Sequence, residues 1–266
     1  MFNFTKMHGL GNDYVFVDCT NSKNIINNPA NLSRIISNRN FGIGSDGLIL
    51  IEKSTVADFK MRIFNSDGSE AEMCGNGIRC VGKYVFDNNL TTKTSLKIET
   101  LAGIKQVDLK IKNNIVYSAS VCVGKYEVKN PIQLQINDKN YTVFPATVGN
   151  PHAIIFSDNL DLSEFEKYAP IIEKNSAFPN KTNVEFVKVS NANLIKVLVW
   201  ERGSGKTLAC GTGAAAVTAV CYTQKLVPNL TSVELPGGTL KTYVDSSNNV
   251  YISGPATTVF SGTYYN

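Results

Sequence analysis

The chain has 266 residues, of which 43% are hydrophobic, and a formal net charge of +4. Its basic residues are scattered, without the Lys/Arg run of a nucleic-acid-binding patch, and no apolar stretch approaches the roughly 18 residues of a membrane span. The first residues lack the apolar core of a signal peptide. We therefore expect a cytoplasmic protein that binds neither nucleic acid nor a membrane.

Alternating apolar residues predict two mainly β halves. In the first half, strands are predicted over 2–7, 14–18, 48–52, 59–64, 95–100, 104–111 and 114–123, with a short helix over 31–38. In the second half, a helix is predicted over 162–174, with strands over 132–136, 141–146, 153–157, 184–189, 194–200, 231–235, 239–244 and 249–253. Residues 257–264 are expected to return to the first half.

Two glycine-rich stretches resemble nucleotide-binding motifs but lack the required context. Gly42–Gly47 satisfies GxGxxG, yet a loop precedes it and a strand follows it, whereas the dinucleotide motif needs a strand and then a helix. Gly203–Thr207 ends like a P-loop, but Trp200 occupies the position of the required first glycine. Neither stretch therefore indicates a bound nucleotide.

The six cysteines form no CxxC pair, and the chain has only two histidines, so no metal site is indicated. Structural disulfides are rare in the cytosol. Cys19, Cys80, Cys122 and Cys221 are expected to be ordinary small apolar residues.

Cys74 is predicted to lie where a loop becomes a helix. A strand-like stretch precedes it, and from Ile78 apolar residues recur at i, i+3 and i+7, which is one face of a helix. A helix start presents unpaired N–H groups and the positive end of the macrodipole. A thiol there should ionise more easily than a free thiol of pKa about 8.5, in a range of roughly 3.5–7.5.

The chain contains a second stretch of this kind. Met73–Gly77 and Ala209–Gly213 share the pattern Cys-Gly-x-Gly, 136 residues apart, and the second copy also follows a predicted strand and opens an apolar run. Three further landmarks recur at nearly the same offset. These are Gly11-Asn12 with Gly149-Asn150, Gly47 with Asn183, and Asn65 with Glu201.

Four matched landmarks indicate an internal duplication, and so two similar halves related by a pseudo-dyad. We expect the first half to span residues 1–118, with 256–266 returning to it, and the second half to span 119–255. A pseudo-dyad would bring the helix starts at Cys74 and Cys210 to one cleft between the halves. The expected active site is in that cleft.

Two thiols facing one ligand suit inversion at a carbon acid. One thiolate removes the Cα proton and the other thiol delivers a proton to the opposite face, with pKa values near the working pH. The N–H groups of Gly75, Asn76, Gly211 and Thr212 are placed to receive the charge that develops on the substrate carboxylate. No lysine motif for a Schiff base is seen, so we expect no cofactor.

A single Cys-Gly-x-Gly at a helix start is usually a capped helix with a buried thiol, and a duplication copies structural residues as well. The accompanying polar residues favour a site. They are Asn12, Asn65, Asn150, Asn183, Glu201, Arg202 and His152, all at predicted loop–strand junctions. Asparagines are common in turns, and a histidine can be structural. Arg202 lacks such an explanation and suits a bidentate carboxylate clamp.

These residues resemble the diaminopimelate epimerase family over essentially the whole chain. The resemblance rests on Met7–Asp13, Ile63–Glu70, Met73–Gly77, Gly149–His152, Trp200–Gly203, Ala209–Gly213 and Leu235–Gly238. It implies an α/β (α+β) fold of two pseudo-symmetric domains, each a mixed sheet wrapped around a central helix. It also implies a cofactor-independent isomerase that interconverts LL- and meso-2,6-diaminopimelate, in lysine and peptidoglycan precursor synthesis, and that is usually a cytoplasmic homodimer.

The resemblance implies Cys74 and Cys210 as the two acid/base residues, with His152 and Glu201 supporting catalysis. The substrate contacts that it implies are Asn12, Gly47, Asn65, Gly75, Asn76, Asn150, Asn183, Glu201, Arg202, Gly211 and Thr212. Gly47 departs from the family, because some members carry glutamine there. Two alternatives stay open: a two-cysteine racemase for proline or histidine, and a non-catalytic relative that binds a small anion.

Overall fold

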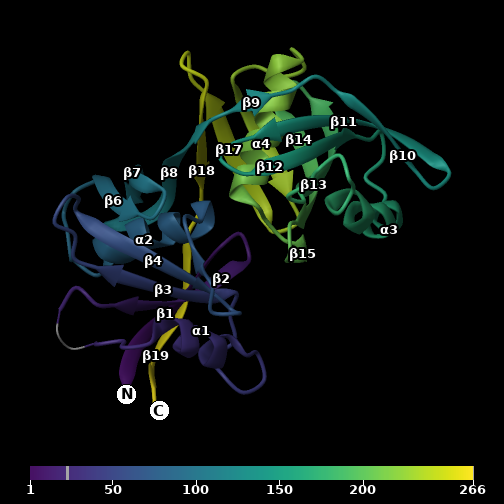
Figure 1. Ribbon diagram of the computed structural model, residues 1–266. Coiled ribbons are helices and arrows are strands. Elements are labelled where there is room, and N and C mark those ends of the chain that lie inside the picture. Colours follow the sequence, from purple (N-terminus) through teal and green to yellow (C-terminus); the bar gives the residue numbers. More distant parts are fainter. Residues whose placement is uncertain (22–23, 266) are drawn as a thin grey trace. The chain divides into compact units, whose positions relative to one another are not determined.

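The computed structural model describes residues 1–21 and 24–265. The chain forms two compact units: Met1–Val121 with the chain from Gly254 onward, and Cys122–Ser253. Each unit combines a mixed β-sheet with two helices, which confirms the predicted α/β class. The chain passes from the first unit to the second within strand β8 (Ile115–Lys125). It returns to the first unit at the end of strand β18 (Asn249–Gly254; Figure 1).

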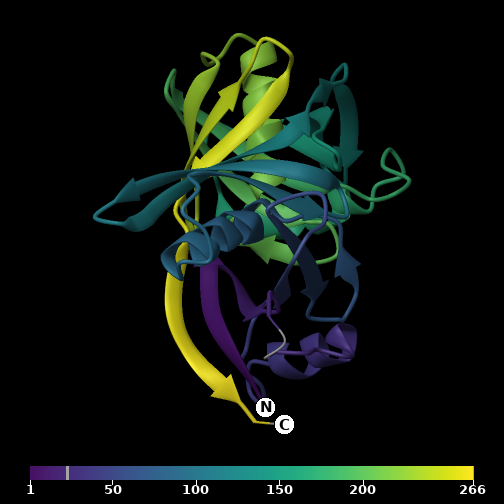
Figure 2. The same cartoon turned by 90° about the vertical axis from the view of Figure 1, so that its left-hand side faces the viewer.

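The first unit is a sheet of mostly antiparallel strands against which two helices pack. Its strands are β1 (Phe2–Gly9), β2 (Asn12–Asp18), β3 (Gly47–Glu52), β4 (Phe59–Asn65), β5 (Glu70–Ala71), β6 (Ser95–Thr100), β7 (Gly103–Lys112), β8 (Ile115–Lys125) and β19 (Thr257–Tyr264). Helix α1 (Pro29–Ser37) packs against β3 and β4, and α2 (Gly75–Asp87) packs against β1, β2 and β7. Figure 2 shows β19 in yellow running beside the purple β1, as predicted for the chain's end.

The second unit repeats the order of strands and helices from β1 to β8, with two strands before the repeat. Its strands are β9 (Glu127–Val128), β10 (Ile132–Ile136), β11 (Lys139–Thr147), β12 (Pro151–Phe156), β13 (Asn183–Asn191), β14 (Leu194–Glu201), β15 (Gly205–Thr207), β16 (Leu230–Leu235), β17 (Gly238–Val244) and β18 (Asn249–Gly254). The repeat runs from β11 to β18, and β9 and β10 precede it. Helix α3 (Leu162–Glu173) packs against β13, β14 and β10. Helix α4 (Gly211–Thr223) is enclosed by strands that include β11, β12, β13 and β17 (Figure 1).

The strand pairings repeat step by step. From β1 to β4 the successive pairs are antiparallel, parallel and antiparallel, and β11 to β14 show the same sequence. Next, β4 pairs with the hairpin strand β5 and in parallel with β6, as β14 pairs with β15 and β16. The topology therefore confirms that the chain is an internal duplication.

The two central helices are buried along most of their length, and α2 carries polar and charged residues into the core. In α2 every residue from Gly75 to Lys83 is buried, and in α4 the apolar run from Gly213 to Cys221 is buried as well. A helix that is buried all round belongs inside a core. At Gly82 a Cβ would lie 2.9 Å from Leu109 Cδ2, so glycine there allows α2 to approach β7 closely.

The structure differs from the prediction at short elements and helix ends. Helix α1 begins at Pro29 rather than at 31, because Asn28 caps it by accepting a hydrogen bond from the Asn31 N–H at 3.0 Å. The two- and three-residue strands β5, β9 and β15 were not predicted, because alternation needs a longer window. Strand β3 begins at Gly47, so a strand continues from the glycine-rich stretch as predicted, and Gly205–Thr207 forms the short strand β15.

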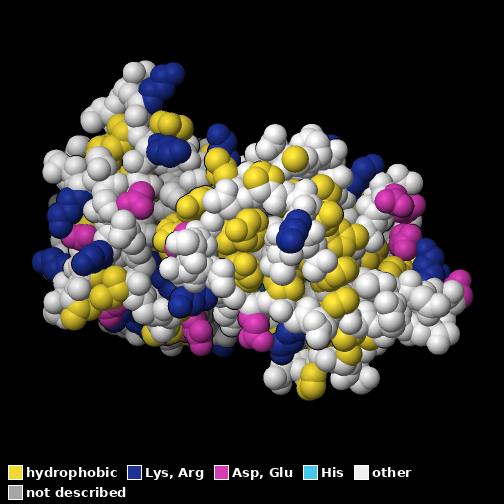
Figure 3. Space-filling model, turned by 90° about the horizontal axis from the view of Figure 1, so that it is seen from above, with side chains coloured by type: hydrophobic (Ala, Val, Ile, Leu, Met, Phe, Trp, Pro, Cys, Tyr) yellow, Lys and Arg dark blue, Asp and Glu magenta, His cyan; other side chains and the backbone are white. Residues whose placement is uncertain are grey.

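No helix in the described part of the chain is long and apolar enough to cross a membrane. On the face shown in Figure 3, Lys and Arg side chains lie among Asp and Glu side chains. The basic residues on that face are therefore spread, as their scatter along the sequence indicates.

Replacement of Gly47 should test the close approach of β3 and β4. A Cβ at this position would lie 2.2 Å from the Phe64 carbonyl oxygen and 3.0 Å from Tyr14 Cε1. Because a backbone atom cannot move aside, Gly47→Ala should lower the free energy of unfolding by roughly 1–3 kcal/mol in urea titrations. Ser66→Ala, in the exposed turn after β4, is the control and should stay within about 0.5 kcal/mol. Equal stability of both variants would contradict the packing described.

Candidate functional site

Cys74 is the N-cap residue of α2, as predicted. Its backbone is extended, with φ −137° and ψ 117°, and its Sγ accepts a hydrogen bond from the Gly77 N–H at 3.4 Å. At most helix starts, the side-chain oxygen of Asn, Asp, Ser or Thr accepts this hydrogen bond. A sulfur atom in this position is therefore held at the positive end of the helix by the fold itself.

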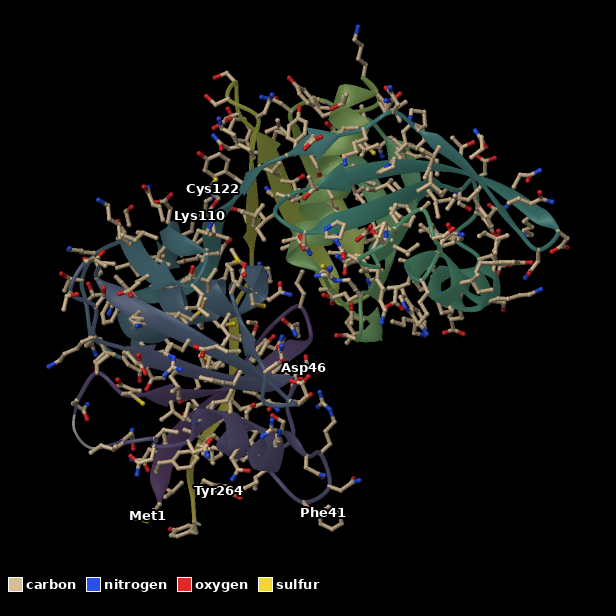
Figure 4. All side chains as sticks on the ribbon, in the orientation of Figure 1. Met1, Phe41, Asp46, Lys110, Cys122 and Tyr264 are labelled. Carbon is tan, nitrogen blue, oxygen red and sulfur yellow. The ribbon has the colours of Figure 1, made fainter. Side chains whose placement is uncertain are left out.

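Asn12 presents its amide oxygen to Cys74. Its Oδ1 accepts hydrogen bonds from Cys74 Sγ at 3.4 Å and from Asn76 Nδ2 at 3.3 Å. Its Nδ2 donates to Asp46 Oδ2 at 2.8 Å, and Asp46 lies in the loop before β3 (labelled in Figure 4). Because the amide nitrogen is tied to a carboxylate, the amide oxygen is fixed toward the sulfur.

A charged network outside Asn12 holds Asp46 in place. Arg39 Nη2 contacts Asp46 at 3.0 Å and Asp13 at 2.8 Å, and Lys6 Nζ lies 2.6 Å from Asp13. Burial raises the pKa of Asp46, while a hydrogen bond from the Asp13 N–H acts in the opposite direction. Burial also acts to raise the pKa of Asp13, but hydrogen bonds from Arg39 and Lys6 outweigh it and lower the pKa.

Arg79 and Tyr14 lie close to Cys74 and were not predicted as site residues. Arg79 is fully buried and donates to the Gly75 carbonyl at 2.9 Å and to Asn76 Oδ1 at 2.8 Å. Burial lowers the pKa of Arg79, and burial together with the neighbouring Cys74 raises the pKa of Tyr14. Arg79 could have been identified as a basic residue in the middle of a helix that is otherwise expected to be buried.

Gly47 and Asn65 are paired across β3 and β4. Asn65 Nδ2 donates to Ser69 Oγ at 3.0 Å, within the turn that leads to β5. Of the predicted residues of this unit, hydrogen bonds directly connect Asn12, Cys74 and Asn76. Gly75 joins this group through Arg79, which contacts both Gly75 and Asn76.

Cys210 repeats the arrangement as the N-cap of α4. Its φ is −120° and its ψ 117°, and its Sγ accepts from the Gly213 N–H at 3.4 Å. Thr212 Oγ1 lies 3.5 Å from the same sulfur. The two cysteine caps are therefore equivalent in backbone and in hydrogen bonding, although their neighbours differ.

Two acidic residues, Glu201 and Glu185, lie near Cys210. Burial raises the pKa of Glu201, while hydrogen bonds with Thr207 and Cys210 act in the opposite direction. Burial, and then the charges of Glu201 and Glu185, raise the pKa of the Cys210 thiol well above its ordinary value. The expectation of an easily ionised thiol at a helix start is therefore wrong for Cys210, because burial and two acidic neighbours outweigh the helix terminus.

His152 is part of a hydrogen-bonded chain that begins at a buried contact with Glu185 and leads, through partly buried side chains, to Cys210. Its Nδ1 lies 2.7 Å from Glu185 Oε1, and both side chains are 0% exposed. Its Nε2 lies 3.1 Å from Asn150 Oδ1, and Asn150 Nδ2 donates to Thr212 Oγ1 at 3.2 Å. The structure thus brings together the predicted residues Asn150, His152 and Thr212, and adds Glu185.

Asn183 and Arg202 lie beside this group. Asn183 Nδ2 donates to the Pro151 carbonyl at 2.9 Å, and its Oδ1 accepts from the Arg202 N–H at 2.9 Å. The Arg202 side chain is exposed and donates to the Asn180 carbonyl at 3.1 Å. Asn183 therefore orients the backbone of Arg202, and the guanidinium lies at the surface of the unit.

The remaining cysteines differ from Cys74 and Cys210 in position and environment. Cys80 and Cys221 are buried within the central helices, and burial raises the pKa of each thiol to about 12. Burial raises the pKa of Cys19 to about 11. In contrast to Cys74 and Cys210, none of these three thiols caps a helix in the described part of the chain.

The family model described as diaminopimelate epimerase matches residues 4–126 and 144–259. The chain is 48% identical to the diaminopimelate epimerase of Methanococcus maripaludis (strain C6), over 97% of this chain and 98% of that one. It is 45% identical to the diaminopimelate epimerase of Acetivibrio thermocellus, over 97% of each chain.

Solved structures with the same fold are more distant in sequence. A phenazine biosynthesis protein of the PhzF family from Bacillus anthracis has a TM-score of 0.77 at 20% identity, covering 98% of each chain. A probable proline racemase from Agrobacterium radiobacter has a TM-score of 0.73 at 12% identity, covering 100% of this chain and 93% of that chain. At such identities the likeness shows the fold alone.

Removal of the Glu201 charge should make Cys210 easier to ionise. Glu201 raises the pKa of Cys210, so Glu201→Gln should lower that pKa and increase the thiolate fraction at a given pH. The rate of iodoacetamide alkylation, followed for each cysteine-containing peptide by mass spectrometry across a pH series, reports this change. The midpoint for Cys210 should move to lower pH, while Cys221 stays unreactive as an internal reference. An unchanged or higher midpoint for Cys210 would contradict the electrostatics described.

Proposed function

The chain belongs to the diaminopimelate epimerase family, and on that premise we propose that it interconverts LL- and meso-2,6-diaminopimelate by proton transfer between two thiols and one α-carbon. The observation that carries the proposal is the matched pair of cysteine caps. Cys74 and Cys210 have equivalent backbone conformations and each accepts the N–H three residues later. Such a repeat supplies an acid and a base of the same chemical kind.

The proposed reaction begins with Cys210 as the thiol, because burial and two carboxylates raise its pKa. Cys74, as a thiolate, removes the α-proton from one face of the substrate carbon. The electron pair left on that carbon takes the proton of Cys210 from the opposite face. Cys74 then carries the proton and Cys210 the negative charge, so the reverse reaction follows the same path with the roles exchanged.

Stabilisation of the carbanion-like intermediate is assigned to the two helix starts. The N–H groups of Gly75, Asn76, Gly211 and Thr212 lie in the first turns of α2 and α4, at the positive end of each helix. Oriented N–H groups at the positive end of a helix stabilise a carboxylate whose charge increases in the transition state. Both proton transfers and this stabilisation are supplied by the chain, so the proposed reaction requires no cofactor.

The proposal places the substrate in a cleft between the halves 1–118 and 119–255, with one cysteine from each half. A pseudo-dyad relating two such halves would present the cysteine caps to opposite faces of one ligand. Asn65, Asn183 and Arg202 would hold the second amino-acid group of the substrate, which needs polar partners. His152 and Glu201 would support proton transfer near Cys210.

We also propose that the protein is a cytoplasmic homodimer that acts in lysine and peptidoglycan precursor synthesis, as the family resemblance implies. Strand β19 exposes Val259 and Phe260 by 55% and 47%, although Phe260 also packs edge-on against Phe4. Exposed apolar side chains on such a strand suit a contact with a second copy of the chain.

Incubation of the protein with LL-diaminopimelate in D₂O, without pyridoxal phosphate, tests the reaction. Proton NMR should show deuterium entering the α-carbon and the meso isomer forming, because each thiol exchanges its proton with solvent. Cys74→Ala should abolish net inversion, while Cys80→Ala, six residues further along the same helix, should retain it. A binding protein would show no exchange in any form, and a proline or histidine racemase would show exchange with proline or histidine instead.

Arg202 should contribute to substrate binding. Charge-assisted hydrogen bonds contribute about 1.5–3 kcal/mol, so Arg202→Ala should raise KM for diaminopimelate roughly tenfold to a hundredfold. Lys206→Ala is the matched control, because Lys206 is exposed and is paired with Glu166. Steady-state kinetics in which both variants keep the wild-type KM would remove Arg202 from the substrate contacts.

A further inference from the structure

Glu185 occupies a position that the duplicated fold fills differently in its two units. A Cβ at Gly77 would lie 2.6 Å from Ile49 Cδ1 and 3.7 Å from Cys74 Sγ. A Cβ at the equivalent Gly213 would lie 2.8 Å from Glu185 Oε1 and 3.4 Å from Cys210 Sγ. The same place beneath a cysteine cap therefore holds a methyl group in one unit and a carboxylate in the other.

The residue that faces this position also differs between the units. Tyr14 pairs with Gly47 between β2 and β3, and His152 pairs with Asn183 at the equivalent point between β12 and β13. The first unit thus has Tyr14 and Ile49 where the second has His152 and Glu185. The exchange replaces a neutral pair by a pair of side chains that can carry opposite charges.

Both ring nitrogens of His152 contact side-chain oxygen atoms. These are Glu185 Oε1 at 2.7 Å and Asn150 Oδ1 at 3.1 Å. Asn150 presents its oxygen to the ring because its Nδ2 donates to Thr212. A ring that donates from both nitrogens is an imidazolium. The Glu185 carboxyl group is fully buried, and its Oε2 has no hydrogen-bond partner in the described chain. An imidazolium that donates from both nitrogens would pair with this group and balance its charge.

A continuous chain of contacts connects this pair to the reactive sulfur. It runs from Glu185 to His152, Asn150 and Thr212, and ends at Cys210 Sγ, 3.5 Å from Thr212 Oγ1. The other groups that face the pair or the sulfur from neighbouring elements are Glu201 on β14 and the first turn of α4. A carboxylate that fixes the ring of a histidine also fixes what the other ring nitrogen contacts.

We propose that Glu185 is a positioning residue, which holds His152 as an imidazolium and thereby aligns Asn150 and Thr212 on Cys210. Its contribution to turnover rests on the proposed epimerisation, in which Cys210 transfers the proton. Of the two cysteine caps, only Cys210 has this histidine–glutamate pair beside it, because the first unit has Tyr14 and Ile49 at the equivalent positions. The two acid/base residues are therefore expected to respond differently to the loss of equivalent neighbours.

The test uses Glu185→Gln, which keeps the shape of the side chain and removes its charge. The chain has only two histidines, His8 and His152, so ¹⁵N-histidine labelling with a His8→Gln spectrum for assignment resolves each ring. In the substrate-free wild-type protein at neutral pH, His152 should show two protonated nitrogens. In Glu185→Gln it should show one protonated and one unprotonated nitrogen.

Kinetics of the same variant should show a split between kcat and KM. Misalignment at Cys210 should lower kcat about tenfold to a hundredfold, with much less effect on KM. Glu234→Gln removes an exposed carboxylate of the same unit, which is paired with Lys196, and should change neither kcat nor the ring signals.

A double variant separates positioning from folding. H152Y/E185I introduces the residue types of the first unit, Tyr14 and Ile49, and so leaves no buried charge unpaired. It should recover thermal stability relative to Glu185→Gln while kcat stays low. A neutral His152 ring in the wild type, or a wild-type kcat in Glu185→Gln, would overturn the inference. A further outcome is that the ring signals behave as expected while no form of the protein turns over diaminopimelate. That result would support the role of Glu185 in keeping His152 protonated and would contradict the proposed function.

Discussion

The structure depends on a hydrogen bond from a backbone N–H to a cysteine sulfur at the start of each central helix. Gly77 donates to Cys74 and Gly213 to Cys210, both at 3.4 Å. A glycine at the third helical position is required in both places, because a Cβ would meet Ile49 or Glu185. In the pattern Cys-Gly-x-Gly, the cysteine therefore places a thiol at the helix start, and the second glycine leaves room for the side chain of Ile49 or Glu185.

Around this shared frame the two units provide different electrostatic surroundings. Near Cys74 the neighbours are the amides of Asn12 and Asn76, with the buried guanidinium of Arg79 behind them. Near Cys210 they are the carboxylates of Glu201 and Glu185, which raise the pKa of the thiol. The proposed reaction needs one cysteine as a base and the other as an acid. Because the residues around Cys74 and Cys210 differ, the two thiols can differ in protonation before the substrate reacts.

Much of the fold could be predicted from the sequence because the duplication provides an internal check. Strand alternation, the two helix starts and the equivalence of Asn65 with Glu201 all follow from residues at a constant offset. The start of α1 could not be predicted in this way, because it depends on the Asn28 cap. The short strands could not be predicted either, because they depend on pairing partners that the alternation of apolar residues does not identify. Arg79 and Glu185 were missed because they lie in a helix and a strand that read as core. A charged residue in an element covered on every side must be paired, and that is the signal that could have identified them.

The central claim is that Cys74 and Cys210 act on opposite faces of one carbon atom. A crystal structure of the protein with a diaminopimelate analogue bound measures this most directly. We predict that the two sulfur atoms lie on either side of a single α-carbon, with the substrate carboxylate at the N–H groups of both helix starts. An analogue that contacts only one of the two cysteines would contradict it.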